Sequence, residues 1–171
     1  MFNLDAWSLK VYTMPCHPSQ EEGTDFMARQ LVFKAKDVEG FSLPGAEDSF
    51  VSRLLIDSES VGSHSFVVNH FTLKRGNFSD PGGRHPAPFD EAYYVLSGTG
   101  RLFLGEPAEE FDLEPGTVAF IPGGTYHAVI NLGEDDLELL TVMTGPLKEG
   151  VNPVYDARRK AWGTSFRLKQ G

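Results

Sequence analysis

The chain has 171 residues, of which 24 are acidic and 15 are Lys or Arg, so its formal net charge at pH 7 is −9. Nucleic acids and acidic membrane surfaces are recognised by basic patches, and this charge balance therefore argues against both as partners. At about 100–200 residues per domain the length fits one domain with arms, and a hydrophobic content of 40%, with 13 Phe, suffices for a sizeable core.

The cysteine content and the first residues favour a soluble cytoplasmic protein. The single cysteine, Cys16, allows no internal disulfide, which is typical of a reducing compartment. The opening sequence MFNLDAWSLKVYTM lacks a basic start followed by an apolar core, so we expect no signal peptide. No apolar run approaches the ~20 residues of a membrane span. Cys16 and His17 are adjacent ligands without sequence partners, a weak pattern for a metal site, and we interpret them as loop residues.

Residues 1–45 are interpreted as an N-terminal arm, in which 7–12 and 30–34 are short strand-like runs. Residues 50–56, FVSRLLI, form the first clear strand, and residues 65–73, SFVVNHFTL, are strongly β-type by content. In the second strand Asn69 and His70 point to opposite faces, and the sequence does not decide which face is inside. Both therefore stay candidate pocket residues.

A glutamate heads the next predicted strand, residues 91–97 with the sequence EAYYVLS. Alternation puts Glu91, Tyr93 and Val95 on one face. Burying a carboxylate costs several kcal/mol unless it is paired or metal-bound, so Glu91 lies at an open rim or has a cationic partner. Tyr93 is a candidate pocket acid or hydrogen-bond donor, with plain packing as an equal alternative. Arg101, on the strand at 101–104, is a candidate for binding an anionic substrate, although a solvated position is more common.

The segment GTVAFIPGGTYHAVIN at residues 116–131 reads as turn, strand, turn and strand, at lengths where a hairpin can close. Its alternation puts His127 and Val129 on one face, beside a Gly-rich turn that leaves room for a ligand. Residues 137–143 form the last predicted strand. Strands of four to nine residues separated by Gly/Pro turns are typical of an all-β sandwich or barrel, which we place at residues 46–145.

The tail, residues 146–171, holds the one predicted helix. We expect it at residues 156–162, with Asp156 as its cap and Gly163 as its end. Trp162 and Phe166 would help this helix pack on the barrel.

Two stretches together resemble the cupin superfamily. Its second motif, G-(x)5-P-x-G-(x)2-H-(x)3-N, is satisfied at every position by Gly116, Pro122, Gly124, His127 and Asn131. Five fixed residues at fixed spacing rarely coincide by chance, and the resemblance covers residues 65 to 143.

The first motif, G-(x)5-H-x-H-(x)3-4-E-(x)6-G, lacks one histidine. Glu91 and Gly98 have the right separation. In one register His85 is the first histidine and Ala87 stands at the second position. In the other, His85 is the second histidine and Gly83 replaces the first. Both registers keep the same histidine.

The resemblance implies a double-stranded β-helix, that is, a jelly-roll barrel, often dimeric, and we expect a homodimer. It also implies that His85, Glu91 and His127 converge on one divalent metal; imidazole and carboxylate ligands suit Fe, Mn, Co, Ni, Cu or Zn. We expect a metal-dependent enzyme on a small oxygen-bearing metabolite, with Glu91 and Tyr93 as catalytic residues. Dioxygenase chemistry is the first hypothesis. The alternatives are isomerase or lyase chemistry on a sugar or small acid, and a non-catalytic small-molecule binder.

Overall fold

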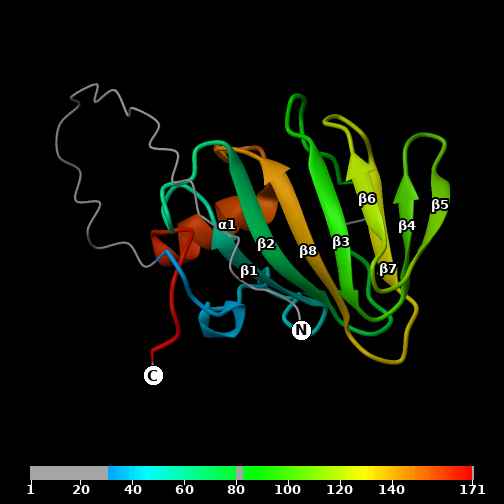
Figure 1. Cartoon of the computed structure of the whole chain (residues 1–171), viewed down its shortest axis with the longest axis horizontal. Coiled ribbons are helices and arrows are strands. Elements are labelled where there is room, and N and C mark those ends of the chain that lie inside the picture. The colour runs from blue at the N-terminus through cyan, green and yellow to red at the C-terminus, as the bar shows by residue number, and fades with distance from the viewer. Residues whose placement is uncertain (1–30, 80–82, 171) are drawn as a thin grey trace, which may run out of the picture.

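The computed structural model describes residues 31–79 and 83–170 (Figure 1), which form eight strands, one α-helix and a short 3-10 turn. In chain order the elements are η2 (Ala35–Asp37), β1 (Phe50–Ile56), β2 (Phe66–Leu73), β3 (Glu91–Ser97), β4 (Gly100–Leu104), β5 (Glu109–Leu113), β6 (Val118–Ile121), β7 (His127–Asn131), β8 (Leu137–Thr144) and α1 (Pro153–Trp162). The predicted all-β fold is confirmed.

The strands form two antiparallel sheets, one of five strands in the order β1-β2-β8-β3-β6 and one of three in the order β5-β4-β7. The main core lies between them, because its buried side chains come from both sheets: Leu73, Val95, Leu137 and Leu139 from the larger, and Leu102, Leu113 and Val129 from the smaller. This is the cupin jelly-roll arrangement that the motif predicted. The domain limits at residues 46 and 145 stay predictions.

The predicted hairpin at residues 117–130 is wrong. β6 pairs with β3, in register Glu91↔Ile121, whereas β7 pairs with β4, in register Leu104↔His127. The turn after Ile121 therefore crosses from one sheet to the other. The edge of β7 that a hairpin would need is occupied instead by the incoming loop, through bridges Phe78↔Ile130 and Gly83↔His127.

The described part of the arm, residues 31–45, contributes no strand to either sheet. Residues 31–34 are not a strand, contrary to expectation. Isolated bridges join Val38 to Leu168 and Phe41 to Ser52, so the arm is held to the tail and to the edge strand β1. The strand expected at residues 7–12 and the Cys16–His17 pair lie outside the described residues.

The tail helix α1 begins earlier than predicted. Asn152, not Asp156, is its N-cap, because the Asn152 side chain accepts a hydrogen bond from the Tyr155 amide at 3.0 Å and Pro153 occupies the first turn. The helix ends as predicted at Gly163, which has the left-handed φ of 74°.

Helix α1 lies next to β1 and β2 (Figure 1). Its buried Tyr155 joins a second apolar cluster with Leu54, Val67 and Met143 of the large sheet. Trp162 and Phe166 contact the arm residues Phe41 and Phe33, with ring centroids 5.3 and 5.5 Å apart. Within the described ranges no helix is long and apolar enough to span a membrane.

Candidate metal centre

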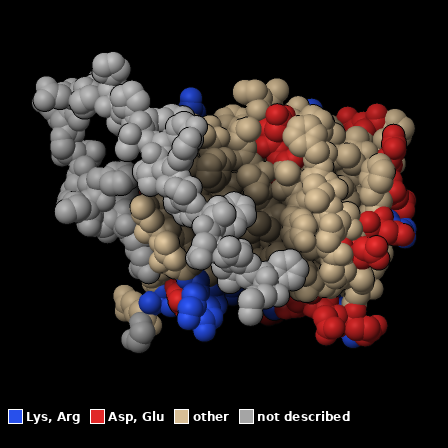
Figure 2. Space-filling view, viewed as in Figure 1, with Lys and Arg blue, Asp and Glu red and all other residues tan. Residues whose placement is uncertain are grey.

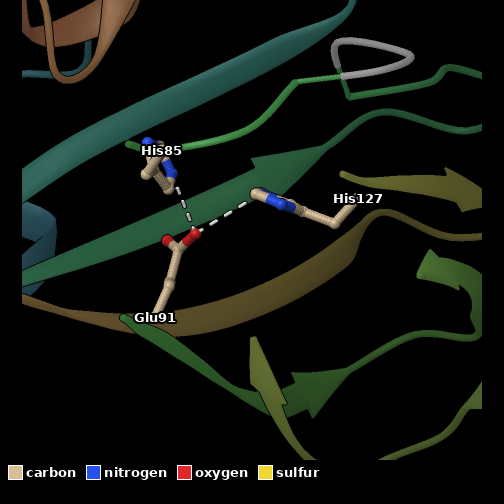
Figure 3. A group of neighbouring side chains, drawn as sticks. All are labelled: His85, Glu91 and His127. Carbon is tan, nitrogen blue, oxygen red and sulfur yellow. Dashed lines mark hydrogen bonds and ion pairs between the residues drawn. The ribbon is translucent and has the colours of Figure 1, made fainter. Parts of the chain in front are cut away.

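Three side chains from separate parts of the chain meet inside the barrel (Figure 3): His85 from the loop before β3, Glu91 from the first position of β3 and His127 from the first position of β7. Their potential ligand atoms all lie within 4.8 Å of one another. Glu91 Oε2 is 3.0 Å from His85 Nε2 and 3.6 Å from His127 Nε2. The structure therefore brings together the three residues that the motifs single out.

The Glu91 carboxylate is buried, with 6% of the residue exposed. Its backbone is fixed on both sides, because β3 pairs with Ile121 of β6 and with Met143 of β8 at this position. A carboxylate held there needs a positive partner. Glu91 was expected either to lie at an open rim or to have a cationic partner. Because it is buried, it does not lie at an open rim, and the two imidazoles are its neighbours.

Each histidine is oriented by a backbone carbonyl. His85 Nδ1 lies 3.1 Å from the oxygen of Val151, and His127 Nδ1 lies 3.1 Å from the oxygen of Thr125. A carbonyl oxygen only accepts, so each Nδ1 carries the proton, and the Nε2 of a neutral ring then presents a lone pair. Both lone pairs face Glu91. This arrangement of acceptors requires a cation between them, either a proton or a metal ion.

The protonation of the metal-free site reflects this arrangement. Burial alone would lower the pKa of His85, but the hydrogen bond and negative charge of Glu91, helped by the Val151 carbonyl, outweigh burial and raise it. The pKa of Tyr93 lies well above its usual value, because its side chain is buried and lies close to the Glu91 carboxylate. Tyr93 is therefore a phenol, not a phenolate, at neutral pH.

The donor set fits a transition metal. Zinc binds imidazole nitrogen and carboxylate oxygen at about 2.0–2.2 Å, so neighbouring ligand atoms around a tetrahedral ion are about 3.3–3.6 Å apart. The 3.6 Å between Glu91 and His127 matches that spacing, and the 3.0 Å between Glu91 and His85 is a few tenths of an ångström shorter. Metal-ligating histidines also commonly donate their other ring N–H to a carbonyl, as both do here. His85, Glu91 and His127 can thus hold a metal ion.

The structure favours one of the two registers of the first motif. Gly83 bridges to His127 and lines the same cavity, whereas Ala87 is exposed and is not among the cavity residues. Gly83 therefore occupies the position of the missing histidine. Because glycine offers no side-chain ligand, this position supplies no fourth protein ligand to the centre.

The three residues line a cavity of about 450 Å³, which is in the range of small-molecule sites. Its walls are mostly apolar, with Phe50, Leu54, Phe71, Leu139, Met143 and Leu147 among them. Asn69 and Tyr93 also line it, so the inner face of β2 is the one that carries Asn69. The Asn69 Oδ1 accepts a hydrogen bond from Ser52 Oγ at 2.8 Å.

Two candidate pocket residues lie elsewhere. His70 is on the outer face of β2, opposite Leu140, with its Nε2 3.5 Å from Glu138. The Arg101 side chain forms ion pairs of 2.8 and 2.9 Å with Glu110 and Asp112, in the acidic region around β4 and β5 (Figure 2). Neither lines the cavity, because strand alternation turns both away from it, and the assignment of these two to a pocket is corrected.

A basic residue in the cavity wall was not predicted. Arg158 of α1 is 2% exposed and lines the cavity. The signal was available in the helical spacing, because Arg158 follows Val154 by four positions and Tyr155 by three, and so shares their face. A helix assumed to begin at Asp156 hides that periodicity.

Comparison with known proteins finds a domain family that matches part of the chain and solved structures that share its fold. Residues 69–143 match the family described as Cupin domain. The polyketide cyclase RemF from Streptomyces resistomycificus is 23% identical, with 77% of this chain and 93% of that chain covered and a TM-score of 0.57. The oxalate decarboxylase of Lactobacillus farciminis, in its formate complex, is 19% identical, with 70% and 35% covered and a TM-score of 0.60. KdgF from Halomonas sp. is 17% identical, with 67% and 94% covered and a TM-score of 0.54. The sequence has no significant match among curated proteins.

Proposed function

The chain carries a cupin domain, and we propose that it is a metal-dependent enzyme that acts on a small oxygen-bearing metabolite bound in the barrel cavity. The observation that supports this most is the orientation of the two imidazoles. Both Nδ1 atoms are engaged by carbonyl oxygens, and both Nε2 atoms are directed at one buried carboxylate oxygen. A packing role for these residues would not need two lone pairs aimed at a negative charge.

The proposed cofactor is a divalent transition metal held by His85, Glu91 and His127; the ligand types suit Fe, Mn, Co, Ni, Cu or Zn. When bound, such an ion polarises an oxygen of the substrate as a Lewis acid. Three protein ligands and the glycine at position 83 leave coordination positions for that oxygen.

Tyr93 is the proposed proton donor. Its phenol lies in the cavity wall, 8% exposed, and its ring centroid is 6.2 Å from that of His127. Because its raised pKa keeps the proton on the oxygen at neutral pH, the phenol can donate to a developing negative charge on the substrate. Glu91 serves the site as a ligand and as the acceptor that raises the pKa of His85.

Dioxygenase chemistry remains the first hypothesis, since two histidines, one carboxylate and open positions are the ligand composition of non-haem iron oxygenases. Isomerase or lyase chemistry is the second. The solved structures compared include one named as a cyclase and one named as a decarboxylase, but at these identities they support the fold alone and do not choose between reactions.

Turnover of a metabolite panel by protein loaded with iron, manganese or zinc tests the proposal. Oxygen consumption identifies a dioxygenase, and product formation without oxygen uptake identifies an isomerase or lyase. Tyr93→Phe is expected to lower kcat about a hundredfold, because general-acid catalysis contributes that much, while metal content stays the same. Ligand-induced stabilisation without any turnover or metal dependence would instead indicate a non-catalytic binding protein.

A further inference from the structure

We propose that Arg158 binds the carboxylate of the substrate, so that the substrate is a small monocarboxylic acid whose apolar body lies between this residue and the metal centre. The placement of the substrate next to the metal rests on the proposed function. The role of Arg158 rests on separate residues, in α1 and β1, and can be tested without metal.

The Arg158 guanidinium has unused donors inside the cavity wall. Its Nη2 donates to Ser52, at 3.1 Å to the carbonyl and 2.7 Å to the hydroxyl. Its Nε is buried and has no hydrogen-bond partner, and no hydrogen bond of the described residues uses Nη1. A guanidinium presents five N–H donors in a planar fork that matches a carboxylate. A bound anion would satisfy the donors that the protein leaves free.

The positive charge also lacks a direct partner. Asp57 is the acidic residue whose charge raises the pKa of Arg158. Its oxygens, however, accept hydrogen bonds from the Ser60 and Glu59 amides and from the Ser165 hydroxyl. No ion pair joins it to Arg158 among the described residues. Burial lowers the pKa of Arg158 to about 10, which still leaves the guanidinium charged at neutral pH. Stacking near Phe41 and Trp162 holds the group in place without neutralising it.

The position of Arg158 relative to the metal centre sets the shape of the substrate. Its partner Ser52 is on β1 and Glu91 is on β3, with β2 and β8 between these strands. Three steps of about 4.8 Å place the two strands about 14 Å apart across the sheet. Leu54, Leu139 and Met143 line the cavity, so an apolar carbon body suits the space between the two polar ends.

The charge balance of the cavity favours a carboxylate over a phosphate. Arg158 is the only buried Lys or Arg among the described lining residues, since Arg84 is exposed and stacks on Tyr126. A single buried cation in mostly apolar walls matches a monoanion. A phosphate dianion would need further donors.

The test compares acids with their uncharged amides. Calorimetry of the full-length, metal-free chain with 4-methylbenzoate and 4-methylbenzamide, and with 4-methylpentanoate and its amide, avoids direct binding of the acid to a metal. We expect each acid to bind at least about tenfold more tightly than its amide, and Arg158→Met to abolish that preference. Lys160→Met, an exposed position on the same helix, should leave the preference unchanged.

Equal affinity of the wild type for acid and amide, or an intact preference in Arg158→Met, would overturn the assignment. If that variant does not fold, Arg158→Lys replaces it: the acid should bind more weakly and the amide as in the wild type, and unchanged acid binding counts against the assignment. Zinc titration of the same proteins separates the two proposals. Acid preference without zinc binding would support the role of Arg158 and contradict the metal site. Zinc binding without acid preference would support the metal site and contradict the role of Arg158.

Discussion

At the scale of single residues, the metal centre is defined by what Glu91 faces. Its carboxylate is buried beside two rings whose Nδ1 protons are already committed to carbonyl oxygens. These hydrogen bonds to backbone carbonyls orient both rings with Nε2 toward Glu91. The consequence is a site that binds either a proton or a metal ion.

This competition predicts how zinc binding depends on pH. The pKa of His85 is raised above 6.5 in the metal-free protein, so the ring is protonated below that raised value and neutral above it. Zinc requires the neutral ring, and its affinity is expected to fall as the pH falls through the raised pKa, by about tenfold per pH unit for each proton displaced.

Calorimetric zinc titrations between pH 6 and pH 8, in buffers of different ionisation enthalpy, measure both the affinity and the protons released. The fall should begin above pH 6.5, earlier than for an unperturbed imidazole. An affinity that stays constant down to pH 6.5 would contradict the raised pKa of His85 and the contact with Glu91 that raises it.

At the scale of elements, the motif asparagine supports the end of β7 rather than the chemistry. Asn131 is 1% exposed. Its Nδ2 donates to the carbonyls of Leu73 and Asp135 at 2.8 and 2.9 Å, and its Oδ1 accepts from the Gly133 amide at 2.9 Å. One side chain thus joins β7, the end of β2 and the turn before β8.

Asn131→Ala is expected to lower the free energy of unfolding by about 3 kcal/mol, because buried backbone groups lose their partners. Asn77→Ala is the matched control, since this side chain makes one exposed bond, to the Arg75 carbonyl, and should change stability by less than about 0.5 kcal/mol. Urea unfolding of both variants measures the difference; equal losses would show that Asn131 has no special role.

How far the sequence predicts the structure also depends on the element. β1 and β3 have the predicted limits, because each is a compact β-type run bounded by turn residues. The pairing of β6 and β7 was not predictable from length, since the partner of each strand is decided by long-range packing. The inner face of β2 was equally ambiguous, because apolar residues occur on both faces.

The residues of the candidate site likewise differ in how far the sequence predicts them. His127 and Glu91 follow from fixed spacing within one motif each, and His85 follows from its distance to Glu91. Arg158 comes from a helix outside the motifs and reaches the cavity only through the packing of the tail on β1 and β2. The helical spacing puts Arg158 on the same face as Tyr155, but no local pattern says which surface that face packs against.

At the scale of the whole molecule, the large sheet has an apolar outer face at its β6 edge. Val118 and Phe120 are 69% and 60% exposed, and Tyr94 and Leu96 of the neighbouring β3 are 45% and 43% exposed. The register Tyr94↔Val118 places the β3 and β6 side chains on one surface. A contiguous exposed apolar patch of this kind marks an interaction site, and we propose that a second copy of the chain covers it.

Light scattering is expected to give twice the chain mass of 18.9 kDa for the wild type. Phe120→Asp should give the monomer mass, because it buries a charge in the interface. Phe111→Asp makes the same substitution on β5, where Phe111 is 44% exposed, and this variant should remain a dimer. A monomeric wild type, or loss of the dimer in both variants, would refute an interface at β6.

The proposed function depends on the metal centre, and zinc titration of metal-free protein tests this centre most directly. The wild type should bind one zinc ion per chain. His127→Ala should bind at least about tenfold more weakly while remaining folded, and His70→Ala, which alters a histidine outside the cavity, should bind as the wild type does. Far less than one zinc ion per wild-type chain, or equal affinity in His127→Ala, would contradict the proposed metal site.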